Sequence, residues 1–289
     1  MLPGFPQHFF LIGAMKAGTS SMYEHLAAHP AIYPASRKEP RFFANPGPSA
    51  RDFSAYAALF AGRTTETWTF EASTAYTKYP MISGVPERIH AAFPEARMIY
   101  LLRDPVERIC SAYLHNLAAG RERRSLEEAV FGDSPEYLSV SRYHLQVSQY
   151  LRVFPRQRIL LLFFEAFIAD VGGTLEQVAR FLQLESGFDP VETTRRDNET
   201  AAKRVPGRSL DALTRLPGYS VLPWRVRRWT TERMTKPLPE KREILDTRLR
   251  ARILEALDDD LVQLRQLLGC ELSSWNLAPA PHGLAKTPD

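Results

Sequence analysis

The segment that decides the fold is FFLIGAMKAGTSSMYEHLAA, residues 9–28. An apolar run at residues 9–12 leads into a loop that begins at Gly13 and ends at Gly18, and a helical pattern follows. A strand, a glycine-containing loop and a helix in this order present backbone N–H groups and the positive end of a helix dipole to an anion. Lys16 adds a positive charge to the same loop. The segment therefore predicts an α/β fold with a P-loop-like anion site.

The loop differs from a Walker A loop in the position of its lysine. That motif has two glycines five residues apart, followed by Lys and then Ser or Thr. Gly13 and Gly18 keep the spacing, but Thr19 occupies the lysine position and Lys16 lies inside the loop. The residues alone leave two interpretations open, a phosphate-binding loop with a displaced lysine and a plain strand–turn–helix connection.

The composition indicates a globular protein with an ordinary core. The chain has 289 residues, 44% of them hydrophobic, and a formal net charge of +4, which is too small to predict nucleic-acid binding. Cys110 and Cys270 lie far apart and outside any Cys/His cluster, so we expect two buried free thiols and no metal site. No apolar run has the length of a membrane span, and the first one leads into the glycine loop, so we expect a cytoplasmic protein without a signal peptide.

Apolar runs and helical patterns alternate along the chain. The predicted strands are residues 9–12, 68–71, 97–102 and 158–164, with a short extended piece at 31–34. The predicted helices after the first one are residues 52–60, 83–93, 105–120, 125–130, 143–154, 174–182 and 249–268. Alternation of this kind implies right-handed crossovers and a mainly parallel sheet. We therefore expect a single-domain, three-layer α/β sandwich.

One domain is predicted over residues 1–276. Within it, residues 186–245 have many Arg and Pro residues and no sustained period, so we expect irregular segments and short helices that cover the domain. Residues 277–289 are predicted to be a disordered tail. The closing helix at residues 249–268 has apolar side chains in phase and belongs to the core.

Polar clusters follow three of the predicted strands. They are the loop of Lys16, the segment that begins at Glu71 and contains Ser73 and Thr74, and the pair Arg103–Asp104. In parallel sheets, ligands bind beyond the carboxyl ends of the strands. We therefore expect the three clusters to meet at one edge of the sheet.

The second informative stretch is RMIYLLRDPVERICSAYLHN, residues 97–116. Arg103 ends the predicted strand, and Ser111 follows eight residues later, about two turns into a helix. A guanidinium and a hydroxyl so placed can hold one phosphate. The residues alone leave other interpretations open, namely an ion pair of Arg103 with Asp104 or Glu107 and an ordinary helical serine.

Taken together, the two stretches resemble PAPS-dependent sulfotransferases, where PAPS is 3′-phosphoadenosine 5′-phosphosulfate. GAMKAGTSS resembles the 5′-phosphosulfate loop of that family, and LLRDPVERICSAY resembles its 3′-phosphate motif. KEPRFF, EASTAY, RYHLQVSQYLRVFPRQRILLLFFEAF and LRQLLGCELSSW are similar to the branch that includes heparan-sulfate N- and 3-O-sulfotransferases and their bacterial relatives. The resemblance extends over residues 8–276.

The resemblance implies transfer of a sulfuryl group from PAPS to a hydroxyl or amine of a carbohydrate or another small metabolite, with PAP as product and no metal. Lys16 would stabilise the leaving phosphate, and Glu39 of KEPRFF would be the general base, with His115 as the second candidate. The implied nucleotide-binding residues are Lys16, Ala17, Gly18, Thr19, Ser20, Ser21, Arg103, Ser111 and Arg208 of a late basic loop.

Several alternatives stay open. Glu39 can instead be a solvated glutamate paired with Lys38 or Arg41, and His115 can be a structural helix residue. Glu71 matches a recurrent glutamate at a strand end of the family, and a structural or orienting role is its alternative. Ala72 stands where the 3-O-sulfotransferase pattern has lysine. The competing functions are an ATP-dependent kinase of the P-loop type and a non-catalytic nucleotide-fold binding protein. The acceptor and the oligomeric state are not fixed by the sequence.

Overall fold

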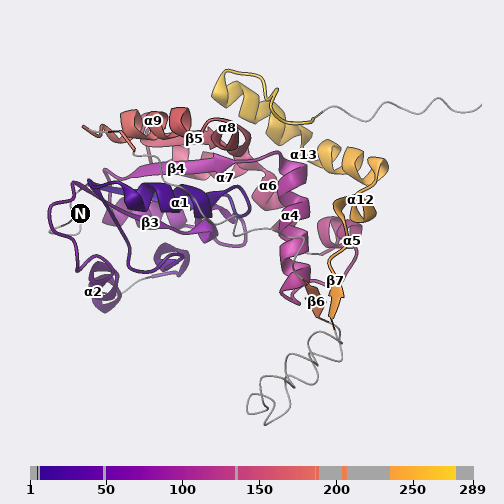
Figure 1. Ribbon diagram of the computed structural model, residues 1–289, viewed down its shortest axis with the longest axis horizontal. Coiled ribbons are helices and arrows are strands. Elements are labelled where there is room, and N and C mark those ends of the chain that lie inside the picture. The colour runs from indigo at the N-terminus through magenta and orange to yellow at the C-terminus, as the bar shows by residue number, and fades with distance from the viewer. Residues whose placement is uncertain are drawn as a thin grey trace, which may run out of the picture.

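The centre of the molecule is a five-stranded, all-parallel sheet in the order β2–β3–β1–β4–β5 (Figure 1). The computed structural model describes residues 5, 7–47, 50–133, 136–185, 187–188, 204–206 and 235–277. The strands of the sheet are β1 (Gln7–Gly13), β2 (Ile32–Pro34), β3 (Trp68–Ala72), β4 (Arg97–Leu102) and β5 (Ile159–Phe163). This architecture confirms the α/β fold with a central parallel sheet.

Helices cover both faces of the sheet. The α-helices are α1 (Thr19–Ala28), α2 (Ala50–Ala58), α3 (Val85–Ala92), α4 (Pro105–Ala118), α5 (Leu126–Phe131), α6 (Glu136–Ser141), α7 (Tyr143–Leu151), α8 (Phe164–Ala169), α9 (Val171–Leu182), α12 (Lys241–Ile244) and α13 (Thr247–Leu268). The 3-10 turns are η1 (Phe42–Ala44), η2 (Thr74–Thr77) and η3 (Arg156–Arg158). No described helix is both long enough and apolar enough to cross a bilayer.

Successive side chains of β1 point to opposite faces of the sheet, and each face carries a layer of aromatic side chains. On one face Phe9 stacks on Phe70 with ring centroids 4.9 Å apart, and Tyr23 of α1 packs on Phe70. On the other face Phe10 meets Phe43 and Phe93 in edge-to-face contacts. Burial of both faces explains why these strands are continuous apolar runs in the sequence.

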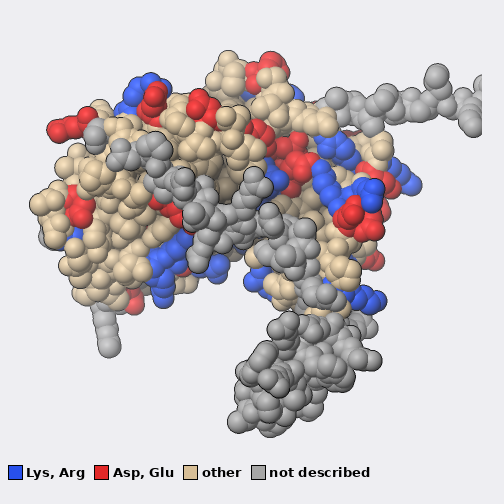
Figure 2. Space-filling view, in the orientation of Figure 1, with Lys and Arg blue, Asp and Glu red and all other residues tan. Residues whose placement is uncertain are grey.

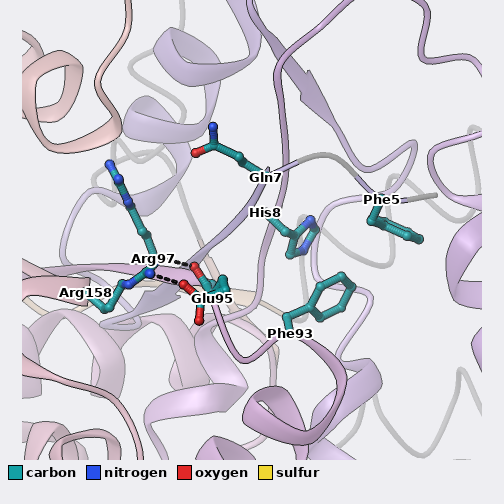
Figure 3. Close-up of a pocket in the computed structure, with 8 residues that line it drawn as sticks. Phe5, Gln7, His8, Phe93, Glu95, Arg97 and Arg158 are labelled. Atoms are coloured by element: carbon teal, nitrogen blue, oxygen red, sulfur yellow. Dashed lines mark hydrogen bonds and ion pairs between the residues drawn. The ribbon is translucent and has the colours of Figure 1, made fainter. Parts of the chain in front are cut away.

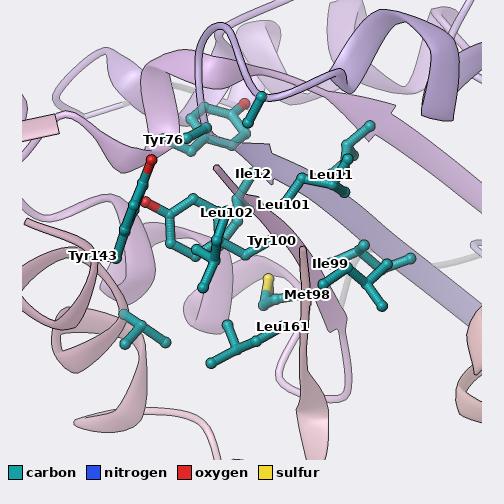
Figure 4. Packing of buried hydrophobic residues seen from close by; sticks show 14 of the residues in the cluster. Leu11, Ile12, Tyr76, Met98, Ile99, Tyr100, Leu101, Leu102, Tyr143 and Leu161 are labelled. Atoms are coloured by element: carbon teal, nitrogen blue, oxygen red, sulfur yellow. The ribbon is translucent and has the colours of Figure 1, made fainter. Parts of the chain in front are cut away.

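The core includes β4, of which residues 98–102 are fully buried. Figure 4 shows Tyr100 near the side chains of Tyr143 and Tyr76, with Met98 of the same strand and Leu161 of the adjacent β5 below it. Tyr100 and Tyr143 lie 6.0 Å apart between ring centroids. This packing fixes the carboxyl end of β4, from which Arg103 emerges.

The carboxyl ends of β4 and β5 are tied to the last described segment of the chain. Asp104 is the N-cap of α4, and its Oδ1 accepts hydrogen bonds from the N–H groups of residues 106 and 107, as its position before Pro105 predicts. Asp104 Oδ2 accepts from the N–H of Asn276. Glu165 accepts from the N–H of Asp104 and from Trp275 Nε1.

The predicted bounds of β5 were wrong at its end. Phe164, predicted as strand, begins α8, and Glu165 lies in the first turn of that helix. An apolar run gives the same pattern in a buried strand and in the buried first turn of a helix, so hydrophobicity alone cannot locate the junction. Helix α6 lies between the helices predicted at residues 125–130 and 143–154, where no helix was predicted.

The segment 186–245 is not wholly irregular or helical. It contains the antiparallel pair of β6 (Arg204–Pro206) with β7 (Thr235–Pro237), and the short helix α12. Three-residue strands are too short to produce a periodic signal. Over α12 and α13 acidic and basic side chains are interspersed (Figure 2), and Lys241 pairs with Glu107 of α4.

The prediction of two buried thiols holds for one cysteine only. Cys110 is buried inside α4, whereas Cys270 is exposed. Cys270 follows Gly269, the left-handed residue that ends α13, so it lies beyond the apolar face of that helix. The predicted tail, except for Leu277, lies outside the described residues.

Candidate functional site

A cleft of about 320 Å³ opens beyond the carboxyl ends of β1 and β3. It is lined by Met15, Lys16, Gly18, Thr19, Ser20, Lys38, Glu39, Arg41, Thr74 and His115. Six of these were predicted as site residues from the sequence: Lys16, Gly18, Thr19, Ser20, Glu39 and His115. Segments that lie far apart in the sequence thus meet at the edge of the sheet where the polar clusters were expected.

The glycines of the first loop are required by close contacts. A Cβ on Gly13 would lie 2.2 Å from Thr77 Oγ1. Gly18 has φ of +84°, and a Cβ there would lie 2.6 Å from a ring carbon of Phe164. Lys16 itself has a positive φ of 74°, which is uncommon for a residue with a side chain. The loop is therefore held in one tight conformation.

The helix after the loop presents an uncapped amino end. Gly18 occupies the N-cap of α1 without a side-chain hydrogen bond, and the first turn contains no acidic residue. The first N–H groups of a helix have no partner inside the helix, and the dipole favours negative charge there. Together with Lys16, this end of α1 has the chemistry of an anion site.

Arg103 contacts the loop directly. Its Nη1 donates to the main-chain oxygen of Lys16 at 3.0 Å, and its guanidinium carbon lies 4.8 Å from the centroid of the Phe164 ring. Asp104 caps α4 and Glu107 pairs with Lys241, so the alternative partners considered for Arg103 are engaged elsewhere.

Three predicted nucleotide-binding residues of the described structure, Ala17, Ser21 and Ser111, do not line this cleft. Ser111 is half-buried on α4, and Ala17 is fully buried beneath the loop. Ser21 is half-buried in the first turns of α1. Arg208 lies outside the described residues, so the structure gives it no position.

Glu39 lines the cleft in an unusual backbone conformation, with φ of +55°. Its carboxylate accepts hydrogen bonds from the N–H of Thr74 at 3.1 and 3.2 Å and from Thr74 Oγ1 at 3.0 Å. Arg41 Nε lies 3.7 Å from the same carboxylate, so the pairing with Arg41 is present. The side chain is nevertheless 29% exposed, and it faces the loop of Lys16 across the cleft.

Sequence reasoning assigned no role at the site to Lys38 or Arg41 beyond pairing with Glu39, and it placed Thr74 only in a polar cluster at this edge of the sheet. Lys38 Nζ donates to Ser20 Oγ at 2.6 Å and so joins the KEPRFF segment to α1. Burial lowers the pKa of Lys38, while Glu39 and Glu24 act in the opposite direction. A signal was available, because Lys38 and Arg41 flank the predicted base in the sequence.

A buried carboxyl group lies behind the cleft on β3. Glu71 is fully buried, and neither of its oxygens is in hydrogen-bonding geometry with a described residue. Burial raises the pKa of Glu71 to about 8, and the charge of Glu39 adds to the shift, while the hydroxyl of Tyr76 opposes it. Glu71 is therefore protonated at neutral pH, which makes it unsuitable as a base there.

A larger cavity, of about 460 Å³, lies at the opposite edge of the sheet (Figure 3). Aromatic side chains of Phe5, His8 and Phe93 line one side, and the Glu95–Arg158 ion pair lines the other. Burial lowers the pKa of His8 to about 3, so that ring is neutral. The smaller cleft, which contains the glycine loop and a carboxylate, is the better candidate for group transfer. No group of three or more metal-ligating side chains occurs among the described residues.

Comparison with known proteins gives one family. Residues 38–190 match the family model described as "Sulfotransferase family". Carbohydrate sulfotransferase 15 of Homo sapiens is 24% identical over 245 residues, covering 61% of this chain and 44% of that protein. Heparan sulfate glucosamine 3-O-sulfotransferase 3A1 of Mus musculus is 28% identical over 186 residues, covering 61% and 45%.

A solved structure agrees over nearly the whole chain. A sulfotransferase from Alicyclobacillus acidocaldarius superposes with a TM-score of 0.67 at 27% identity, covering 93% of this chain and 98% of that one. The chain spans about half the length of the curated relatives it matches.

Proposed function

We propose, from the premise that this chain belongs to the sulfotransferase family, that it transfers a sulfuryl group from PAPS to a hydroxyl or amine, releasing PAP. The observation that carries the proposal is the cleft, where an anion-binding loop with Lys16 faces the carboxylate of Glu39. Relatives named as carbohydrate and heparan sulfate glucosamine sulfotransferases favour a carbohydrate acceptor over other small metabolites.

The residues present fit a phosphosulfate group. The amino end of α1 has no side-chain cap and no acidic residue in its first turn, so its N–H groups suit an anion. Thr19 and Ser20 add hydroxyl donors at the cleft wall. Arg103, Ser111 and Arg208 are proposed for the 3′-phosphate by the resemblance of their motifs. In the described structure Arg103 donates to the main chain of the loop. It can therefore also support nucleotide binding indirectly, by fixing the shape of the loop.

PAPS would supply the sulfuryl group and a phosphate as leaving group. Lys16 stabilises the negative charge that develops on that phosphate, together with the N–H groups of the loop. Glu39 accepts the proton of the acceptor hydroxyl or amine. His115 lines the same cleft and contacts the acceptor or passes on the proton.

Glu39 is favoured over His115 as the base because of its hydrogen bonds. Three hydrogen bonds from Thr74 hold the carboxylate in one orientation at the cleft, as a positioned base requires. Glu71 is protonated and does not compete with Glu39 for this role. The cytoplasmic location and the domain bounds derived from the sequence stay predictions.

Two other functions are distinguishable from this one. A P-loop kinase would bind ATP with Mg²⁺, whereas the position after Gly18 holds Thr19 in place of the Walker lysine. A non-catalytic binding protein would bind PAP but transfer nothing. Family membership favours the sulfotransferase over the kinase.

Thermal unfolding and transfer assays test the proposal. We expect PAP to raise the midpoint of unfolding and ATP with Mg²⁺ to leave it unchanged. With ³⁵S-labelled PAPS and heparan sulfate or chondroitin oligosaccharides, label should enter the saccharide, and Glu39→Gln should abolish this. Stabilisation by ATP–Mg²⁺ without stabilisation by PAP would contradict the proposal. Binding of PAP without transfer to any of a panel of saccharides and amines would favour the non-catalytic protein.

A further inference from the structure

We infer that Thr74 is a positioning residue for Glu39, which holds its carboxylate oriented toward the cleft. The inference rests on the proposed function, in which Glu39 is the general base. Thr74 lines the same cleft as Lys16 but contacts no reacting atom in this account. It acts only through the carboxylate.

One residue supplies all the hydrogen bonds that the Glu39 carboxylate receives from neutral groups of the described structure. The N–H of Thr74 is shared between Oε2, at 3.1 Å, and Oε1, at 3.2 Å, and the hydroxyl donates to Oε1 at 3.0 Å. Thr74 is only 8% exposed, so these contacts are largely shielded from water. Hydrogen bonds to an ionised group are stronger than those between neutral groups.

The backbone around Glu39 needs external support. Glu39 and Arg41 both have positive φ, at 55° and 54°, and neither is glycine. Such conformations persist only where the surroundings hold them, and they concentrate at functional sites. A base carried on a loop of this kind is precise only if a rigid element fixes it.

The end of β3 and the turn η2 form that rigid element. Residues 72–76 run alongside residues 39–43 and bind them at every second position. Three main-chain N–H groups donate: Glu39 N–H to the Ala72 main-chain oxygen at 2.9 Å, Arg41 N–H to Ser73 Oγ at 3.0 Å and Phe43 N–H to Tyr76 Oη at 3.1 Å. Thr74 is the residue of this segment whose hydrogen bonds reach the Glu39 carboxylate.

Other charged or titratable groups also lie near Glu39, and a test must leave them in place. They are Arg41 at 3.7 Å, the adjacent Lys38, Lys16 and His115 across the cleft, and Glu71 on β3. Thr74→Val keeps all of these and the N–H contact, and removes only the hydroxyl. Thr74→Ser keeps the hydroxyl.

Carbon-13 NMR of protein labelled at the glutamate carboxyl carbon tests the inference without an acceptor. The Glu39 signal is assigned by its loss in Glu39→Gln. We expect its titration midpoint to rise by about one pH unit in Thr74→Val, because the ionised form loses a donor. Thr74→Ser should titrate like the natural protein. Coinciding titrations of Thr74→Val and the natural protein would overturn the inference, and Thr74→Ala repeats the test if the valine variant does not fold.

A matched variant and an activity measurement complete the test. Thr69 lies on β3, the strand that precedes Thr74, and makes a buried contact of 2.7 Å with His8 Nδ1, so Thr69→Val loses a comparable hydrogen bond far from the cleft. It should lower stability and leave the Glu39 titration unmoved.

With labelled PAPS and heparan sulfate oligosaccharides, Thr74→Val should lower turnover about tenfold and shift the acidic limb of the pH profile upward. No transfer by the natural protein would count against the proposed function, while the titration would still decide the role of Thr74.

Discussion

The guanidinium of Arg103 holds the main-chain oxygen of Lys16 at 3.0 Å. This contact joins the two most informative stretches of the sequence, because Lys16 lies after β1 and Arg103 after β4. Lys16 has φ of 74°, and its carbonyl is directed by that conformation. The arginine predicted to bind a phosphate therefore also fixes the shape of the first loop.

Replacing Arg103 should weaken nucleotide binding through the loop. We expect Arg103→Lys to lower PAP affinity by about tenfold or more, because lysine cannot reproduce the planar fork or its stacking on Phe164. Calorimetric titration with PAP measures this. Arg97→Lys, at the other end of β4, is the matched control and should alter stability without altering affinity. Equal affinities of Arg103→Lys and the natural protein would show that the contact is dispensable.

Replacing Lys16 should affect turnover far more than folding. We expect Lys16→Ala to lower kcat by about 100-fold or more with any saccharide acceptor that the natural protein sulfates, since a cation at the leaving group acts mainly in the transition state. The midpoint of thermal unfolding should change little. Lys78→Ala, which removes a lysine paired with Glu136 outside the cleft, should keep full turnover. Undiminished turnover of Lys16→Ala would rule out its role at the leaving group.

The sheet and the cleft were largely predictable because they depend on local patterns. The buried strands at residues 9–12 and 97–102 are continuous apolar runs, and Asp104 with Pro105 marks a helix start. Parallel strands then bring their carboxyl ends to one edge whatever the exact pairing. The meeting of Lys16 and Glu39 follows from that rule together with the family resemblance.

The sequence does not reveal which individual groups far apart in the chain contact one another. Thr74 binds the Glu39 carboxylate across 35 residues of sequence, and such a contact has no periodicity. The short strands β6 and β7 pair across the segment predicted as irregular, again without a local signal. The role of Arg103 changed most, since a residue pattern specifies a charge at a strand end but not which group it will bind.

Asp260 should be a strong contributor to stability. This buried residue of α13 accepts hydrogen bonds from the N–H groups of His144 and Leu145 at 3.0 and 2.8 Å, at the amino end of α7. Asp260→Ala leaves two donors without a partner, so we expect a loss of about 2–3 kcal/mol in the free energy of unfolding. Urea unfolding measures it, with the exposed Asp259→Ala as control. A loss no larger than that of the control would contradict this role.

The buried carboxyl of Glu71 should make stability depend on pH. Its pKa is raised from 4.5 to about 8, so the folded state binds more protons than the unfolded state between these values. Stability is then fully retained below pH 4.5 and falls as pH rises toward 8, by about 1 kcal/mol per pH unit. Glu71→Gln carries no titrating group there and should lack this slope.

Urea unfolding of the natural protein and Glu71→Gln between pH 5 and pH 9 tests this expectation. The two proteins should have similar stability at the acid end, and the glutamine variant should be the more stable one above pH 8. Tyr56, Tyr76 and Tyr150 lie near the Glu71 carboxyl group. The side-chain amide of glutamine has nearly the same size, so it fits the same space without carrying a charge. A stability difference that stays constant across the range would mean that Glu71 does not titrate in it.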